Sequence, residues 1–232
     1  MLCYEDFQEA RPGCTKYTLL GEQLSEVSTH QYLGIYIENN LKWDKQTQYA
    51  ITKGTRVLNF IRRNFNHCSR KVKERLYHTL VRPHLEYACI AWHPGTARNF
   101  KSLELVQRRA ARFVMGNYSR ESSVTDMMAS LGWDSLEDRR KNLRLVSFYK
   151  IAHGELHLDL HKYASKKVTR LRRSHEEQYE VTSTFITTTQ LANSFFPDTI
   201  SHWNKLSRET VTSKSANIFK TKLQKPSPNL KK

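Results

Sequence analysis

The sequence predicts a mainly α-helical protein: a helical bundle preceded by a short β-hairpin and followed by a helical and irregular C-terminal region containing short strands. Two observations favour this fold class. Apolar residues recur at helical spacing between about residues 41 and 160, whereas β-branched and aromatic residues gather in two short runs just before them. With 38% hydrophobic residues in 232, the chain is long and apolar enough to bury a substantial core.

The β-hairpin is expected within residues 17–40. Residues 17–20 and 31–37 are rich in β-branched and aromatic side chains, and a polar stretch separates them. We expect these two runs to pair as antiparallel strands and to lie on the helices, because a two-stranded hairpin is only marginally stable alone. Residues 1–16 show no sustained periodicity, so an irregular leader is expected there.

The helical bundle is expected within residues 41–116. Asn40 is a suitable N-cap for a first helix over residues 41–64, which Gly54 weakens by about 1 kcal/mol relative to alanine. The inward positions of this helix are predicted to be Ala50, Val57, Ile61 and Phe65.

Two further helices complete the predicted bundle. One begins near Ser69 and is expected to kink or break at Pro83, which lacks a backbone donor. Its apolar stripe is predicted to run through Val72, Leu76, Leu80, Val81, Leu85, Ala88 and Trp92. The other spans residues 101–116, with a stripe at Leu103, Val106, Ala110 and Phe113. Both helices are rich in arginine on the opposite side.

Residues 117–160 are predicted to be helical, and residues 161–232 to form a basic, Thr-rich region with short helices. A short helix is expected from Ser122 to Met128, ended by Gly132. Ser135 and Asp138 resemble a capping box that opens a helix reaching about residue 152. Later helices are expected within residues 194–206, with Ile200 and Trp203 inward, and over residues 215–223, before a frayed end with Pro226 and Pro228.

The charge of the chain favours a polyanionic partner. There are 38 Lys and Arg against 22 Asp and Glu, a net charge of +16. Nucleic acid is favoured over a membrane surface, because no long apolar run or lipidation signal accompanies the charge. A basic surface without a partner remains an alternative. Four cysteines without paired spacing and the absence of a secretory leader predict an intracellular protein, nuclear or cytoplasmic rather than secreted.

No catalytic motif is evident in the sequence. His153, His157 and His161 recur every four residues, but Gly154 interrupts their helix and no further ligands complete a metal site. Residues 4–7 superficially resemble the Tyr-x-Asp-Asp turn of polymerases, yet Phe7 occupies the second Asp position. We therefore expect no catalytic residue, no metal site and no cofactor within this chain.

The order of several short motifs resembles reverse transcriptases of non-LTR (LINE-type, jockey-like) retrotransposons. Tyr32-Leu-Gly-Ile-Tyr-Ile37 with Leu41-Lys-Trp43 is similar to the end of their palm. The similarity continues through Leu80-Val-Arg-Pro83, Leu85-Glu-Tyr87, Trp92-His-Pro94, Val106-Gln-Arg-Arg-Ala-Ala-Arg112, Leu131-Gly-Trp133, Arg139-Arg140, Ser194-Phe-Phe-Pro197 and Trp203-Asn-Lys-Leu206. It covers nearly everything between about residues 16 and 223.

This resemblance implies a role for each region. Tyr32, Leu33 and Gly34 would belong to the primer grip, which holds the 3′ end of the growing strand. Residues 41–116 would be the thumb that straddles the template–primer duplex, and the rest would be the connection region. The fingers and the palm with its catalytic aspartates, which in the intact polymerase would use Mg²⁺, would be a missing polypeptide. The chain is then a fragment that is not expected to polymerise alone.

The expected partners are RNA and RNA–DNA or DNA duplexes, bound through phosphates without sequence preference. The candidate contacts are Lys53, Arg56, Arg62, Arg63, Lys71, Lys73, Arg75, Arg108, Arg109 and Arg112. Tyr32 and Trp43 are candidates for stacking on bases, with core packing as the alternative for Trp43. Two other functions remain open: a domesticated, non-enzymatic nucleic-acid-binding module, and an inert remnant or protein-interaction scaffold.

Overall fold

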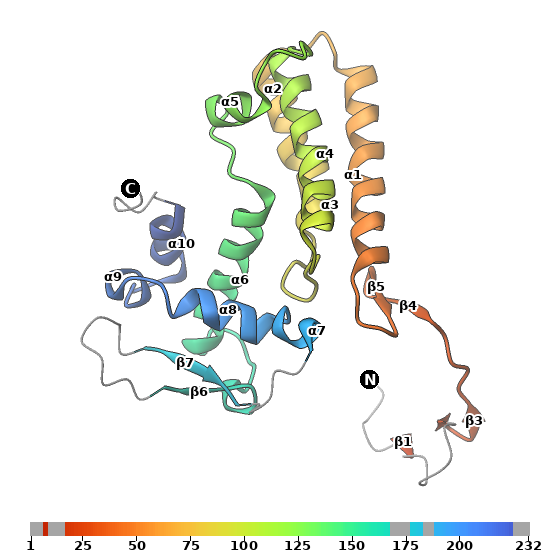
Figure 1. Cartoon of the computed structure of the whole chain (residues 1–232), viewed down its shortest axis with the longest axis vertical. Coiled ribbons are helices and arrows are strands. Elements are labelled where there is room, and N and C mark those ends of the chain that lie inside the picture. The colour runs from red at the N-terminus through yellow and green to blue at the C-terminus, as the bar shows by residue number, and fades with distance from the viewer. Residues whose placement is uncertain (1–6, 9–16, 168–176, 183–187, 225–232) are drawn as a thin grey trace.

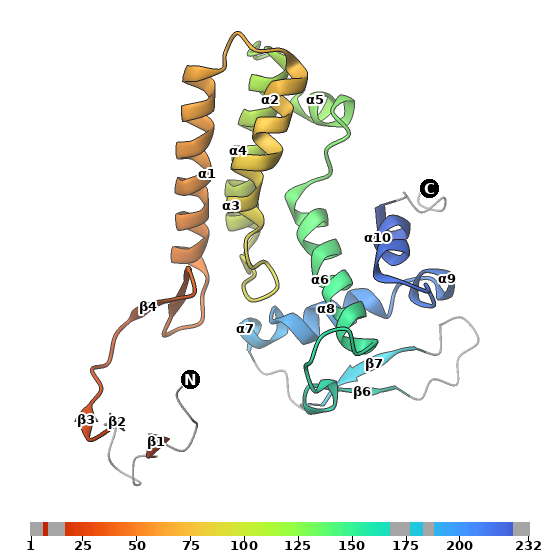
Figure 2. The ribbon, with the colours of Figure 1, turned by 180° about the vertical axis from the view of Figure 1, so that it is seen from behind.

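The computed structural model describes residues 7–8, 17–167, 177–182 and 188–224. The mainly helical fold class is confirmed. A long bundle of helices occupies one part of the molecule, small hairpins lie beyond one end of it, and a second helical unit lies beside it (Figures 1 and 2). The predicted leader over residues 1–16 lies outside the described residues, except for strand β1 (Phe7–Gln8).

The N-terminal strands form two tight hairpins rather than one. Strands β2 (Thr18–Leu19) and β3 (Glu22–Gln23) pair with each other, and β1 pairs with β2. Strands β4 (Thr29–Tyr32) and β5 (Ile35–Glu38) form the second hairpin. The predicted pairing of residues 17–20 with 31–37 was therefore wrong.

Two Leu-Gly pairs explain this difference. Leu20 and Gly21 have φ of 51° and 82°, and Leu33 and Gly34 have φ of 48° and 79°. Positive φ at both central residues is the geometry of a type I′ turn, which joins adjacent strands through two residues. The turn at Leu20-Gly21 thus pairs β2 with β3, and the turn at Leu33-Gly34 pairs β4 with β5.

Helix α1 (Asp44–Asn64) ends where it was predicted to end but begins three residues later than expected. Leu41 has φ of +54°, which is outside the helical region, and the Asn40 side chain accepts from the Lys42 amide at 2.8 Å instead of capping the helix. Gly54 faces the core, and a Cβ there would lie 2.8 Å from Leu85 Cδ2. The glycine lowers helix propensity but permits close packing of α1 on the neighbouring helix.

The second helix consists of α2 (Arg70–Leu76), a π-helical turn (Tyr77–Val81) and α3 (Arg82–Glu86). The Arg82 amide donates to the Tyr77 carbonyl five residues back, directly before Pro83. This widened turn lies where the proline would otherwise crowd the preceding turn. The helix ends at Glu86, because Ala88 has φ of +50°.

The predicted stripe of this second helix was partly wrong. Val72 and Leu80 are exposed, whereas the first buried residue is Tyr77, followed by Val81, Leu85, Cys89 and Trp92. Tyr77 faces inward because its hydroxyl donates to buried Gln107 at 2.6 Å and its ring stacks on Trp133. By contrast, the stripe predicted for the third helix is confirmed. All four of its residues, Leu103, Val106, Ala110 and Phe113, are buried on α4 (Ala97–Met115).

Helices α5 (Val124–Ser130) and α6 (Leu136–Ala152) follow the bundle. The N-cap of α5 is Ser123 rather than the predicted Ser122, since the Ser123 hydroxyl accepts from the Asp126 amide. The predicted N-cap of α6 is confirmed at Ser135, whose hydroxyl accepts from the Asp138 backbone amide at 3.0 Å. The Asp138 carboxylate accepts from the Ser135 hydroxyl at 2.8 Å rather than from the Ser135 backbone amide, as a capping box would require.

Short elements make up the C-terminal unit. They are the 3₁₀ turn η3 (Leu160–Lys162), strands β6 (Ala164–Lys166) and β7 (Tyr179–Val181), and helices α7 (Thr189–Ala192), α8 (Phe195–Trp203), α9 (Arg208–Val211) and α10 (Ala216–Gln224). Ile200 and Trp203 are buried, as predicted. The basic run at 170–173, part of the Thr-rich stretch (183–187) and the prolines near the C-terminus lie outside the described residues.

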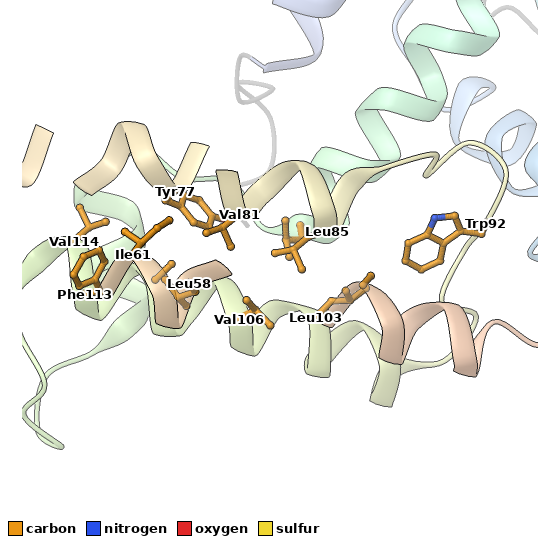
Figure 3. Packing of buried hydrophobic residues seen from close by; sticks show 13 residues of the cluster. Leu58, Ile61, Tyr77, Val81, Leu85, Trp92, Leu103, Val106, Phe113 and Val114 are labelled. Carbon is orange, nitrogen blue, oxygen red and sulfur yellow. The ribbon is translucent and has the colours of Figure 1, made fainter. Parts of the chain in front are cut away.

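Two large hydrophobic clusters stabilise these parts. The first fills the bundle between α1, α4 and the helix containing the π turn (Figure 3). The second joins α6 to β6, β7, α8, α9 and α10. Helix α6 contributes Leu136 to the first cluster and Leu145, Phe148 and Tyr149 to the second, so it connects the bundle with the C-terminal unit.

Candidate nucleic-acid interface

Most of the net positive charge belongs to the helical bundle. Residues 41–116 contain 16 Lys and Arg but only four Asp and Glu, which gives +12 of the total +16. A third of the chain therefore carries three quarters of its excess charge, so the positive electrostatic potential is concentrated on the bundle.

The four carboxylates of the bundle are occupied by structural contacts. The Glu74 carboxylate accepts from the Trp133 indole at 3.0 Å, and the Asp44 carboxylate accepts from the side-chain amide of Asn99 at 2.7 Å. Glu86 pairs with Arg139 of α6, and Glu104 accepts from the Leu136 amide at 2.8 Å. These acidic groups fix the packing of helices and do little to neutralise the predicted contact cations.

The ten predicted cations have no carboxylate partner among the described residues. Six are exposed and four are half-buried. The exposed ones are Arg56, Arg62, Arg63, Lys71, Arg75 and Arg109. Each half-buried one touches a neighbour within the protein: Lys53 lies over the Tyr49 ring and Lys73 over the Phe113 ring, while Arg108 donates to Thr125 and Arg112 to the Ser119 carbonyl at 2.7 Å.

The structure gathers only part of this set. Arg62 and Arg63 line an open hollow at the end of α1 together with Asn59, Asn66 and Tyr118, and the Arg62 guanidinium lies 5.6 Å from the Tyr118 ring centre. Sequence reasoning missed Tyr118, an exposed aromatic beside an arginine. The other cations are distributed along α1, α2 and α4, which suits contact with successive phosphates better than one compact anion site.

The predicted primer-grip residues lie at the tip of the β4–β5 hairpin. Tyr32 is 59% exposed and Leu33 is 73% exposed. The Tyr87 hydroxyl donates to the Leu33 carbonyl at 3.0 Å, and the Tyr87 ring lies against Gly34. On β5, two residues after the turn, the Tyr36 amide donates to the Gln46 side chain of α1 at 2.9 Å. The tip is thus held against the bundle while its side chains face outward.

Three arginines of α6 were not predicted to be structural. Arg140 is 1% exposed, donates to the carbonyls of Leu85 and Trp92, and lies 4.0 Å from the centre of the Trp92 ring. Arg144, also buried, pairs with Asp198, and Arg139 pairs with Glu86. The signal was available: Arg140 and Arg144 continue the four-residue spacing between two buried apolar positions of α6.

Burial lowers the pKa of Arg140 to about 10, with the positive charge of Arg144 acting in the same direction. The group stays charged at neutral pH and is held by two carbonyls and an aromatic face. It belongs to the packing of α6 on the bundle, so it is not available to a ligand.

Within the described residues, no group of three or more His, Cys, Asp and Glu side chains is arranged to hold a metal ion. No helix in the described ranges is both long and apolar enough to cross a membrane.

The fold and its charge define a basic helical-bundle protein with an attached β-hairpin. Comparison with known proteins adds one distant relative. The chain is 26% identical over 129 residues to "Uncharacterized protein B0403.1" of Caenorhabditis elegans, across 54% of this chain and 64% of that protein. The matched part is thus less than two thirds of the relative's length. No protein-family model and no solved structure matches the chain.

Proposed function

We propose that this chain is the thumb and connection region of a non-LTR retrotransposon reverse transcriptase and that its bundle binds template–primer nucleic acid without catalysing synthesis. The observation that carries the proposal is the set of ten cations on α1, α2 and α4 without a carboxylate partner among the described residues. Unpaired cations spaced along a rigid bundle fit a polyanion of regular phosphate spacing, since such binding needs charge and reach but no base contacts.

The hairpin supports the same function. Its tip presents Tyr32 and Leu33 next to the bundle, where a strand terminus held by the primer grip would lie. Exposed large apolar side chains are also frequent in this N-terminal part: Tyr17, Leu20, Leu24, Val27, Tyr32, Leu33, Ile37 and Leu41. Such a surface suits a further polypeptide, and in this proposal that polypeptide is the palm.

The test is a titration of the purified chain against a labelled RNA–DNA duplex at several salt concentrations. The informative variant combines Arg56→Ala, Arg63→Ala and Arg109→Ala, because these side chains are exposed and have no hydrogen-bond or ion-pair partner among the described residues. Arg108 and Arg112 are left intact, since both hold neighbouring parts of the chain. The control combines Lys205→Ala, Lys214→Ala and Lys220→Ala, which removes the same charge from exposed positions of the C-terminal unit.

We expect the wild type to bind with an affinity that falls steeply with salt. The bundle variant should lower the log–log salt slope by roughly 3 if all three arginines contact phosphates, and the control should change it by less than about 1. Equal losses in the two variants would indicate a diffuse charge effect and refute a bundle interface. A folded wild type that does not bind would favour the remnant or scaffold.

A further inference from the structure

A pocket lies at the base of the bundle, where the start of α1, the loop around His93 and the short helix α7 meet; Figures 1 and 2 both show α7 beside the loop that follows α3. It has a volume of about 310 Å³. An adjoining hollow of about 220 Å³ shares five of its residues, Leu41, Trp43, His93, Gln190 and Asn193. The 310 Å³ of the main pocket is at the lower end of the range typical of small-molecule sites.

The pocket combines one aromatic surface with several unused hydrogen-bonding groups. Trp43 is half-buried, and its indole N–H has no partner within the described parts of the chain. The side-chain amides of half-buried Asn193 and of exposed Gln190 also have no partner there. His93 Nδ1 is buried and likewise lacks a partner there. Buried polar atoms are normally paired, so His93 Nδ1 is an exception, and three further side chains at the same cavity keep accessible hydrogen-bonding groups that a ligand could use.

The wall behind these groups is fixed. Asn99 donates to Asp44 at 2.7 Å and to the Pro94 carbonyl at 3.1 Å, which ties α1 and α4 to the loop. Thr96 caps α4 by accepting from the Asn99 amide at 3.2 Å. Asp44 and Thr96 of the wall are therefore occupied, whereas Trp43, Gln190 and Asn193 keep side-chain donors that are unpaired among the described residues and accessible to a ligand.

We propose that this pocket binds a single unpaired nucleobase, stacked on Trp43 and hydrogen-bonded at its edge by Gln190 and Asn193. A base offers a flat ring together with adjacent donors and acceptors, and side-chain amides complement such an edge. Lys42, which also lines the cavity, is positioned to meet the attached phosphate. This inference rests on the proposed nucleic-acid function and adds a base-binding site to a surface that otherwise contacts phosphates.

The protonation state of His93 is compatible with a neutral ligand. Burial, together with the positive charge of Arg144 and against the opposing charge of Asp198, lowers its pKa to about 4. The imidazole is therefore uncharged at neutral pH and presents one donor and one acceptor. The charged lining residues are then Lys42 and Asp44, one of each sign, so the pocket lining carries no net charge and favours a base over a free anion.

The experiment compares two single-stranded RNA octamers, one with bases and one in which every nucleotide is abasic, by anisotropy with the full chain. The two carry the same phosphates, so the difference in affinity measures base recognition. The test variant is Gln190→Ala with Asn193→Ala, and the matched control is Asn217→Ala, an exposed amide on α10. We expect the wild type to prefer the octamer with bases, and the double variant to reduce that preference about tenfold while the control retains it.

A preference for bases that survives the double variant unchanged would overturn the proposal, and so would an equal loss in the Asn217→Ala control. Binding of a blunt RNA–DNA duplex distinguishes failure of the base-binding pocket from failure of the proposed thumb function. If the wild type binds the duplex but shows no preference for bases, the pocket is refuted and the thumb function stands. If it prefers bases through the two amides but does not bind the duplex, the pocket stands and the thumb function fails.

Discussion

Tyr77→Phe is expected to destabilise the protein by removing one oxygen atom. The Tyr77 hydroxyl donates to Gln107 Oε1 at 2.6 Å, and both side chains are 1% exposed. Gln107 uses its Nε2 to donate to Glu104 at 2.9 Å and to the Asp134 carbonyl at 3.0 Å. This small network joins the π turn, α4 and the segment before α6.

The magnitude follows from what the variant leaves behind. Gln107 Oε1 loses its partner, and the amide cannot rotate to find another without giving up its two donor contacts. An unsatisfied buried acceptor costs about 1–3 kcal/mol, whereas loss of the oxygen creates almost no cavity. Burial also raises the pKa of Tyr77 well above its ordinary value, so the donor is protonated at any working pH. We expect a loss of about 2 kcal/mol in the free energy of unfolding.

Urea denaturation is the appropriate assay, with unfolding monitored both by circular dichroism and by tryptophan fluorescence. Trp133 stacks on Tyr77 with ring centres 4.3 Å apart, so it reports on the site directly. A loss of 2 kcal/mol shifts the midpoint by about 1 M urea for a typical m-value of about 2 kcal/mol/M. Tyr118→Phe, at an exposed tyrosine, serves as control and should stay within about 0.5 kcal/mol of wild type. Equal stability of the two variants would refute the network.

Three further expectations concern the backbone and pH. Gly54→Ala should destabilise by about 1 kcal/mol in urea denaturation, because overpacking against Leu85 costs about 1–3 kcal/mol and outweighs a propensity gain of about 1 kcal/mol; a more stable variant would contradict the contact. Leu33→Asn should raise the free energy of unfolding by about 0.5–1 kcal/mol, since asparagine tolerates a φ of 48° better than leucine; thermal unfolding of the variant checks this, and a lower midpoint would argue against the turn. The pKa of His93 is about 4 in the folded chain and 6.5 in an unfolded one. Between these values the unfolded chain binds one more proton than the folded chain, so the free energy of unfolding falls as the pH drops from 6.5 towards 4. In a pH series of denaturation curves, His93→Gln should therefore show a shallower fall than the wild type.

The regular parts of the fold could be predicted from the sequence because local signals and packing agree there. In α4, the spacing of Leu103, Val106, Ala110 and Phe113 matches one helical face, and Gly116 with φ of +65° ends the helix where the pattern ends. The N-cap at Ser135 was predictable for the same reason, since Ser135 and the Asp138 amide that it caps are three residues apart.

The errors arose where long-range contacts decided the outcome. Nothing local distinguishes Leu80 from Tyr77 as the inward residue, because the choice depends on Gln107, which is thirty residues away. The candidate contacts were chosen by charge, and charge alone cannot separate exposed Arg109 from Arg112, whose guanidinium holds a loop carbonyl. Arg140 is the extreme case, since a buried arginine without a carboxylate partner in the described chain contradicts the usual expectation for its type.

The contact between Tyr87 and the hairpin tip has a mechanical consequence. The Tyr87 hydroxyl holds the Leu33 carbonyl, the Tyr87 carbonyl accepts from the Trp92 indole at 2.8 Å, and the Trp92 carbonyl accepts from Arg140 at 2.9 Å. These links form an unbroken tether from an exposed turn to the helix that spans both hydrophobic clusters. Force applied at the tip would therefore be shared between the hairpin and α6, the helix that packs in both hydrophobic clusters.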